Sequence, residues 1–166
     1  MRKDIAPDWE TAEKLYPAIK SHIEKYTEYC DENGDEDFTE YKKLEQCLHE
    51  ITGKDMSQYN LWQWWEEEGL EVLSFRISLP APQLVPDITK DELAEVIALL
   101  KSDSINNQQC NTNNFESTFS IYLDDYYHSL LKLNFKKYKR EYFMSNKGKD
   151  GKYFEYSTKE ATDKIW

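Results

Sequence analysis

The sequence predicts an α+β fold that is mostly helical, with five to six helices packed on a small antiparallel sheet. Apolar residues recur every three or four positions over most of the chain, which is the period of an amphipathic helix. One central segment alternates apolar and polar residues instead, and two short aromatic segments near the C-terminus flank a glycine-containing loop. These patterns add one central strand and a C-terminal hairpin. With 166 residues, of which 39% are hydrophobic, the chain can bury one core, so we expect a single domain over residues 1–166.

The first predicted helix begins after Asp8, which can cap it, and runs to about Asp31. Pro17 lies inside this segment. We expect it to kink the helix or to restart it, because proline lacks the N–H that a helical hydrogen bond needs. The apolar stripe of this helix is formed by Ala12, Leu15, Ile19, Ile23 and Tyr26.

A second helix is expected from Phe38 to Thr52. Asp37 and Glu40 have the spacing of a capping box at its start, and Gly53 stands where a glycine ends many helices. A third, short helix is expected from Ser57 to Gly69.

The hydrophobic period changes after this third helix. Four apolar residues alternate with polar ones, which predicts a half-buried strand. The apolar positions are Leu73, Phe75, Ile77 and Leu79. The next segment contains Pro80, Pro82 and Pro86 and predicts an extended connector that is too short to separate domains.

The C-terminal half predicts further helices. Thr89 and Glu92 form a capping box for a helix to about Lys101, and the polar residues 102–114 predict a long loop. Apolar spacings of three and four then predict a long helix from Phe115 to at least Phe135, although residues 119–123 also alternate like a strand.

Two aromatic segments, residues 141–145 and 152–157, predict a hairpin around a loop that contains glycine. Ser157 and Glu160 have the spacing of another capping box. A last helix should therefore run to Trp166.

Charge is distributed unevenly along the chain, whose formal net charge is −11. Residues 1–100 hold 23 acidic and 10 basic side chains, whereas residues 101–166 hold 9 and 11. An acidic segment repels phosphates and attracts basic surfaces, so we expect a basic protein partner and no nucleic acid; solubility alone is the alternative explanation. We expect one basic, aromatic segment to be a solvated face rather than a nucleic-acid site; it contains Lys132, Lys136, Lys137, Lys139 and Arg140.

Neither membrane insertion nor secretion is expected. The sequence has no apolar run of about 18 residues, and its first ten residues lack the apolar core of a signal peptide. Its three cysteines, Cys30, Cys47 and Cys110, are an odd number at wide spacing. This favours a reducing compartment over a disulfide framework, and we therefore expect a cytoplasmic protein without a membrane partner.

The acidic segment from Cys30 to Phe38 has some features of a calcium loop. Counted from Asp31, residues Asn33, Asp35 and Asp37 fall at ligand positions. However, the glycine comes two residues too early, and Lys42 occupies the position that requires a glutamate. The segment therefore predicts an acidic turn between two helices and no metal site.

No motif for catalysis or for cofactor binding stands out. Glycine-rich phosphate loops and nucleophile elbows are absent from the sequence, so we expect no cofactor. Cys47 and His49 point about 200° apart on a helix and cannot share a metal, and His22 has no partner at ligand spacing. An alternative hypothesis is a small enzyme that uses a helical pair formed by His128 and Asp124 or Asp125.

The tryptophan-rich segment at residues 61–71 has the most unusual composition. On a helix, its tryptophans and Leu61 would span about 160°, which is typical of a core helix. The functional hypothesis is that Trp62 or Trp64, at an edge of this arc, stays exposed beside three glutamates. An aromatic anchor ringed by carboxylates suits a basic protein partner.

Together these observations predict a non-catalytic binding protein. The most concrete hypothesis is an immunity protein that neutralises a basic, nuclease-like bacterial toxin. A structural or regulatory subunit that forms homo-oligomers is a further alternative. The expected partner-binding residues are Asp31, Asp35, Glu36, Trp62, Trp64, Glu66, Glu67 and Glu68.

Overall fold

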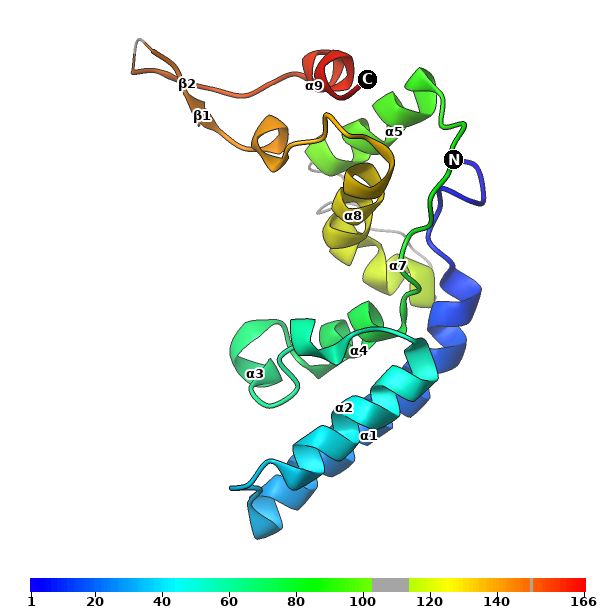
Figure 1. The fold of residues 1–166 in the computed structure, drawn as a ribbon, viewed down its shortest axis with the longest axis vertical. Helices are drawn as coiled ribbons and strands as arrows, with labels where there is room; N and C mark the ends of the chain where they lie inside the picture. Colours follow the sequence, from blue (N-terminus) through cyan, green and yellow to red (C-terminus); the bar gives the residue numbers. More distant parts are fainter. Residues whose placement is uncertain (103–113, 150) are drawn as a thin grey trace. The chain divides into compact units, whose positions relative to one another are not determined.

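The computed structural model describes residues 1–102, 114–149 and 151–166, and it is mainly helical (Figure 1). These residues form eight α-helices and one antiparallel sheet of two strands. The chain divides into two compact units. We call Asp8–Pro80 the helical unit, and Met1–Pro7 together with Ala81–Trp166 the hairpin unit. The expectation of a single domain stays a prediction.

Helix α1, Trp9–Asn33, begins as predicted. The carboxylate of Asp8 accepts a hydrogen bond from the N–H of Thr11 at 3.1 Å, which satisfies one of the unpaired donors of the first turn. Pro17 lies within the helix, which continues on both sides of it. Gly34, with φ at 71°, ends the helix in a conformation that glycine adopts readily.

Helix α2, Thr39–Thr52, starts differently from the prediction. Asp37 does not form a capping box; instead Phe38 occupies the cap position in a left-handed conformation, without a side-chain cap of its own. The carboxylate of Asp35 accepts hydrogen bonds from the N–H groups of Glu40 and Tyr41, at 3.1 and 2.8 Å. The predicted end is confirmed, because Gly53 is left-handed and donates its N–H to His49.

The expected third helix is largely absent. In its place the chain forms a short 3₁₀ helix, η1, Met56–Gln58, and one helical turn, α3, Trp64–Glu67.

The predicted central strand is wrong. Residues Leu70–Ser78 form helix α4, which lies against α1 (Figure 1). Leu73 and Ile77 are one helical turn apart and join the same buried cluster, while Phe75 stacks on Trp9 with ring centroids 5.7 Å apart. Because nearly every side of α4 is buried, its sequence lacks the polar face that identifies a helix.

The core of the helical unit is one cluster between α1, α2 and α4. Its largest contributions come from branched aliphatic side chains, which supply most of the hydrophobic stabilisation. The members are Ile19, Ile23, Tyr26, Leu44, Leu48, Met56, Leu61, Leu70, Leu73 and Ile77.

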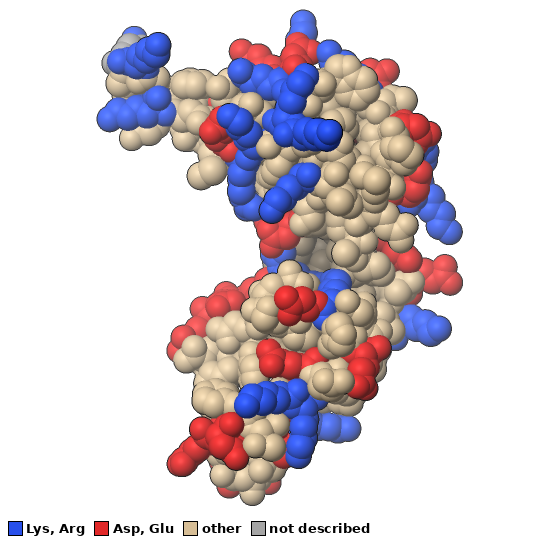
Figure 2. All heavy atoms as spheres, in the orientation of Figure 1, with Lys and Arg blue, Asp and Glu red and all other residues tan. Residues whose placement is uncertain are grey.

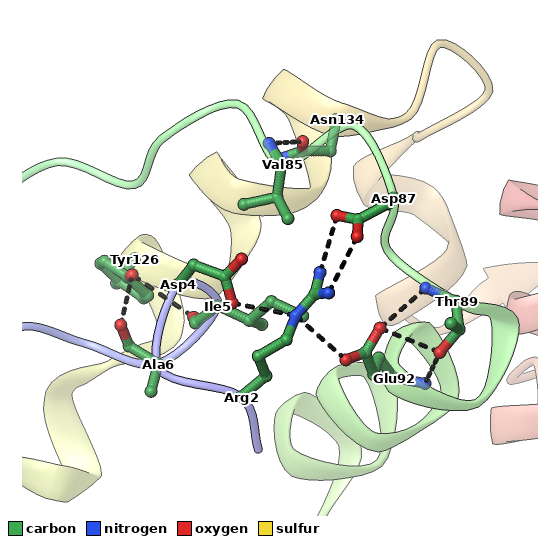
Figure 3. Close-up of polar contacts among 10 residues, drawn as sticks. All are labelled: Arg2, Asp4, Ile5, Ala6, Val85, Asp87, Thr89, Glu92, Tyr126 and Asn134. Atoms are coloured by element: carbon green, nitrogen blue, oxygen red, sulfur yellow. Dashed lines mark hydrogen bonds and ion pairs between the residues drawn. The ribbon is translucent and has the colours of Figure 1, made fainter.

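The hairpin unit is built around helix α5, Lys90–Lys101, with the predicted capping box of Thr89 and Glu92 in place. Figure 3 shows Arg2 between the connector and this helix start. Its guanidinium donates two hydrogen bonds to Asp87, at 3.0 and 3.1 Å, and its Nε lies 3.3 Å from Glu92. The first residues of the chain are thereby held on a segment about 85 positions away.

The long helix predicted from Phe115 is divided. Helix α7, Phe115–Phe119, passes into a 3₁₀ turn, η2, Ser120–Tyr122, and helix α8 then spans Asp124–Asn134. The alternative strand at residues 119–123 does not form either. The segment 103–113, which includes most of the predicted loop and Cys110, lies outside the described residues.

A hairpin forms near the C-terminus as predicted, but its first strand lies within the predicted loop, and most of the expected first arm, residues 141–145, forms a 3₁₀ turn. After a 3₁₀ turn, η3, Arg140–Phe143, strand β1, Asn146–Lys147, pairs antiparallel with β2, Tyr153–Phe154. Helix α9, Thr158–Ile165, has the predicted capping box of Ser157 and Glu160, and Lys90 binds Asp163 at 2.6 Å. None of the described helices is both long and apolar enough to cross a membrane.

Candidate functional site

The centre of the candidate site is a contact between Phe38 and Trp62, whose ring centroids lie 6.1 Å apart. Tyr41 packs edge-on against Phe38 at 6.2 Å, and Tyr26 packs edge-on against both Trp62, at 6.2 Å, and Tyr41, at 5.8 Å. These four rings form a closed cycle of contacts, which we call the aromatic cluster. It joins the two segments that the sequence singles out, namely the acidic turn and the tryptophan-rich segment.

Two rings of the aromatic cluster remain open to solvent. Phe38 is 51% exposed and Trp62 is 36% exposed, whereas Tyr26 is buried. Two large apolar rings in contact and exposed on one surface are typical of an interaction site, because the isolated protein gains little from leaving them in water.

The backbone of Phe38 is strained. Its φ of 57° is the only positive value at a non-glycine position among the described residues. A bulky side chain in this conformation costs free energy, and such strain persists only where the surrounding structure imposes it. Here it aims an aromatic ring outward at the start of α2.

The side chain of Asp35 holds the backbone at the start of α2, next to Phe38. Asp35 is only 7% exposed, and its carboxylate accepts hydrogen bonds from two backbone N–H groups of α2 and from the hydroxyl of Tyr26 at 3.3 Å. Burial alone would raise the pKa of Asp35, but the N–H groups of Tyr41 and Glu40, with the Tyr26 hydroxyl, hold this pKa below its ordinary value. The expected partner residue Asp35 is thus an interior anchor of the acidic turn.

The other expected carboxylates divide into two groups. Asp31, Glu36, Glu66 and Glu67 are exposed. Glu68 is half-buried, and its carboxylate lies 2.5 Å from Nε of Arg76. Its charge is therefore balanced within the helical unit.

The tryptophans of residues 62–65 also differ in burial and in their contacts. Trp64 is half-buried, and its indole N–H donates to Thr27 of α1 at 3.2 Å, so this expected anchor serves packing. Trp65, which sequence reasoning missed, is 55% exposed and lies edge-on to Trp64 at 5.6 Å. Phe38 and Tyr41 were also missed, because only the fold brings them to Trp62.

The net charge of the chain belongs to one unit. The helical unit holds 18 acidic and 7 basic side chains, a net charge of −11, whereas the hairpin unit holds 14 of each. Figure 2 shows carboxylate side chains distributed over the visible face of the helical unit. The aromatic cluster therefore lies in a unit with a strongly negative potential, which attracts cations and basic surfaces.

His128, the centre of the enzyme hypothesis, is held by aromatic neighbours. Its Nδ1 lies 2.9 Å from the hydroxyl of Tyr138, and its ring meets Phe143 edge-on at 4.9 Å. Burial, and then the charge of Arg140, lower the pKa of His128, while Asp124 and Asp125 act in the opposite direction. Catalysis at this histidine stays a prediction, as does homo-oligomer formation.

The basic segment of the hairpin unit lies on the surface. All five of its cations are exposed, and three contact neighbours within the unit. Lys137 donates to Trp166 at 3.1 Å, Lys139 lies 3.5 Å from Glu141, and Arg140 lies 3.9 Å from Asp125. These contacts fit the expectation of a solvated face.

Within the described ranges, no three histidine, cysteine or acidic side chains are grouped so that they could hold a metal ion. Comparisons with protein-family models, with curated proteins and with solved structures find no match to this chain.

Proposed function

We propose that this chain is an acidic binding protein that covers a basic surface of another protein, as an immunity protein covers a toxin nuclease. The observation that carries the proposal is the contact of Phe38 with Trp62, which joins the acidic turn and the tryptophan-rich segment into one exposed aromatic cluster. The setting supports it, because the whole net charge of −11 lies in the same unit.

The two kinds of residue have different roles in this proposal. The exposed carboxylates of Asp31, Glu36, Glu66 and Glu67 accelerate the encounter with a basic partner, since long-range attraction acts mainly on the association rate. The exposed rings of Phe38 and Trp62 are desolvated in the complex and slow its dissociation.

The proposal places the chain in the bacterial cytosol, without a cofactor and without nucleic acid as its partner. Its three cysteines at wide spacing suit a reducing compartment. A strongly negative helical unit disfavours the phosphate backbone of a nucleic acid.

The test is a pull-down from the native host with three immobilised proteins: the wild type, a Phe38→Ala/Trp62→Ala variant and a Tyr153→Ala control. Tyr153 is 72% exposed on β2, so its removal matches the loss of an exposed ring outside the cluster. We expect the wild type and the control to retain one basic protein in stoichiometric amount, and moderate salt to weaken the binding.

The double variant should lose this protein. Retention of the same protein by the double variant would show that the aromatic cluster is not the binding surface. If the wild type retains no basic protein at low salt, the proposal is wrong.

A further inference from the structure

A pocket of about 350 Å³ lies between α1 and α2 of the helical unit. It is lined by His22 and Lys25 from α1, and by Lys43 and Cys47 from α2. The Sγ atom of Cys47 lies 3.6 Å from Nε2 and 3.8 Å from Nδ1 of His22, within hydrogen-bonding distance for sulfur. The sequence gives no sign of this pair, because the two residues are 25 positions apart and only the packing of the helices brings them together.

The pocket is unusual for its charge. The helical unit has only seven basic side chains against 18 acidic ones, yet two of the seven, Lys25 and Lys43, line this pocket. Glu40 lies 2.6 Å from Nζ of Lys43 and balances part of that charge, whereas Lys25 supplies a second ammonium group. Among the lining side chains two ammonium groups face one carboxylate, so the pocket is locally positive within an acidic unit and favours a small anion.

We propose that this pocket takes an anionic, low-molecular-weight disulfide and that Cys47 exchanges with it to form a mixed disulfide. His22 takes the proton of the Cys47 thiol, and the resulting thiolate attacks one sulfur of the bound disulfide. A bond forms between Cys47 and that sulfur as the original sulfur–sulfur bond breaks. The other half leaves as a thiolate with the electron pair of the broken bond and takes up a proton, so the Cys47 sulfur is oxidised by one formal level and the released sulfur is reduced by one.

Cys30 provides a matched comparison within the same chain. It is half-buried like Cys47 and lies two turns further along α1 from His22. Its neighbour is the hydroxyl of Tyr26 rather than an imidazole. A difference in reactivity between the two thiols therefore reports on the pocket and not on exposure alone.

The experiment incubates the reduced, full-length chain with oxidised glutathione, which is anionic, or with cystamine, which is a cationic disulfide. Peptide mapping by mass spectrometry follows each cysteine over time. We expect Cys47 to react at least about tenfold faster than Cys30 with oxidised glutathione, and faster with oxidised glutathione than with cystamine. Equal rates at the two thiols, or a preference for cystamine at Cys47, would overturn the proposal without any variant.

Two variants assign the roles. His22→Gln should slow the reaction of Cys47 by about tenfold and leave that of Cys30 unchanged. Lys25→Gln should reduce the preference for the anionic disulfide while keeping the reaction with cystamine. Unchanged rates in His22→Gln would refute the role of the imidazole. Because no protein partner takes part in this assay, its result is independent of the proposed binding function.

Discussion

The side-chain nitrogen of Lys54 donates a hydrogen bond to the carbonyl oxygen of Arg76 at 2.7 Å, near the end of α4. It also lies 3.3 Å from the hydroxyl of Tyr59. Lys54 thus links the segment that follows α2 to α4. The contact places a cation in a poorly hydrated position, and burial lowers the pKa of Lys54 to about 8.

This contact predicts how stability depends on pH. Between pH 8 and 10 the unfolded chain keeps the proton of Lys54 more often than the folded chain does, so the free energy of unfolding rises with pH, by about 2 kcal/mol from this group. Above pH 10 the rise should end, because burial raises the pKa of Tyr26 and of Tyr127, and their ionisation favours the unfolded chain.

Urea unfolding at several pH values between 7.5 and 9.5 measures this effect. Lys54→Met should abolish most of the rise, whereas Lys42→Met, at an exposed lysine of α2, should leave it intact. Parallel stability curves for the wild type and Lys54→Met would contradict the prediction.

A second prediction concerns two serines of α4. Ser74 is fully buried, and its hydroxyl has no hydrogen-bond partner among the described residues, whereas the buried hydroxyl of Ser78 donates to Phe75 at 2.9 Å. Ser74→Ala should therefore stabilise the protein by about 1 kcal/mol, and Ser78→Ala should destabilise it by a similar amount. Chemical unfolding of both variants measures whether the two changes in the free energy of unfolding have opposite signs. Equal changes would show that the two hydroxyls have similar surroundings.

The strained position of Phe38 gives a third prediction. At most positions a protein with glycine is less stable than one with alanine, but at a φ of 57° the order of the two variants should reverse. Phe38→Gly should be more stable than Phe38→Ala by about 1 kcal/mol, while both lose the ring that contacts Trp62. A more stable alanine variant in urea unfolding would mean that the left-handed conformation is not retained.

Asp35 and Asp37 provide a matched pair for the acidic turn. Asp35→Asn should lower the melting temperature clearly, since the buried carboxylate accepts from two N–H groups of α2. Asp37→Asn should have a smaller effect, since Asp37 is exposed and the oxygen of asparagine can still accept from the N–H of Thr39. Because the pKa of Asp35 is lowered in the folded protein, its stabilisation is present above the ordinary aspartate pKa and is lost as the pH falls through the lowered value. Thermal melts of the wild type in acid should therefore decline more steeply than those of Asp35→Asn.

A fifth prediction tests the charged part of the candidate surface. Reversal of Glu36, Glu66 and Glu67 to lysine should slow association with the captured partner by roughly tenfold at low salt and flatten its salt dependence. Stopped-flow or biosensor kinetics measure both effects. The matched control reverses three exposed carboxylates of the hairpin unit: Asp91, Glu116 and Glu155. If the control slows association equally, the total charge matters and not the location.

Helix ends were the most predictable part of the fold. The caps at Asp8, Thr89 and Ser157, and the glycine at position 53, were read correctly because capping involves residues only a few positions apart. Phe38 is the exception, since the N–H groups of Glu40 and Tyr41 donate to Asp35, which precedes it by three residues, and the nearer Asp37 accepts from Thr39.

The error at α4 arises because burial removes the sequence signal of a helix. In α4 the serines at positions 74 and 78 look like the polar face of a strand, yet both are buried, and with them the evidence for a helical period disappears. The candidate site was half predictable for a related reason. The acidic turn and the tryptophan-rich segment were identified separately, but the ring contact between Phe38 and Trp62 depends on tertiary packing.

The two units can complete their folding at different stages of chain synthesis. All contacts within the helical unit are available once residue 80 has emerged, so this unit can fold early. Arg2, in contrast, is synthesised long before its partner Asp87. The carbonyl groups of Ile5 and Ala6 likewise precede the hydroxyl of Tyr126, which donates to them. The first seven residues thus remain without their partners while the segment that follows them folds, and the hairpin unit is completed last.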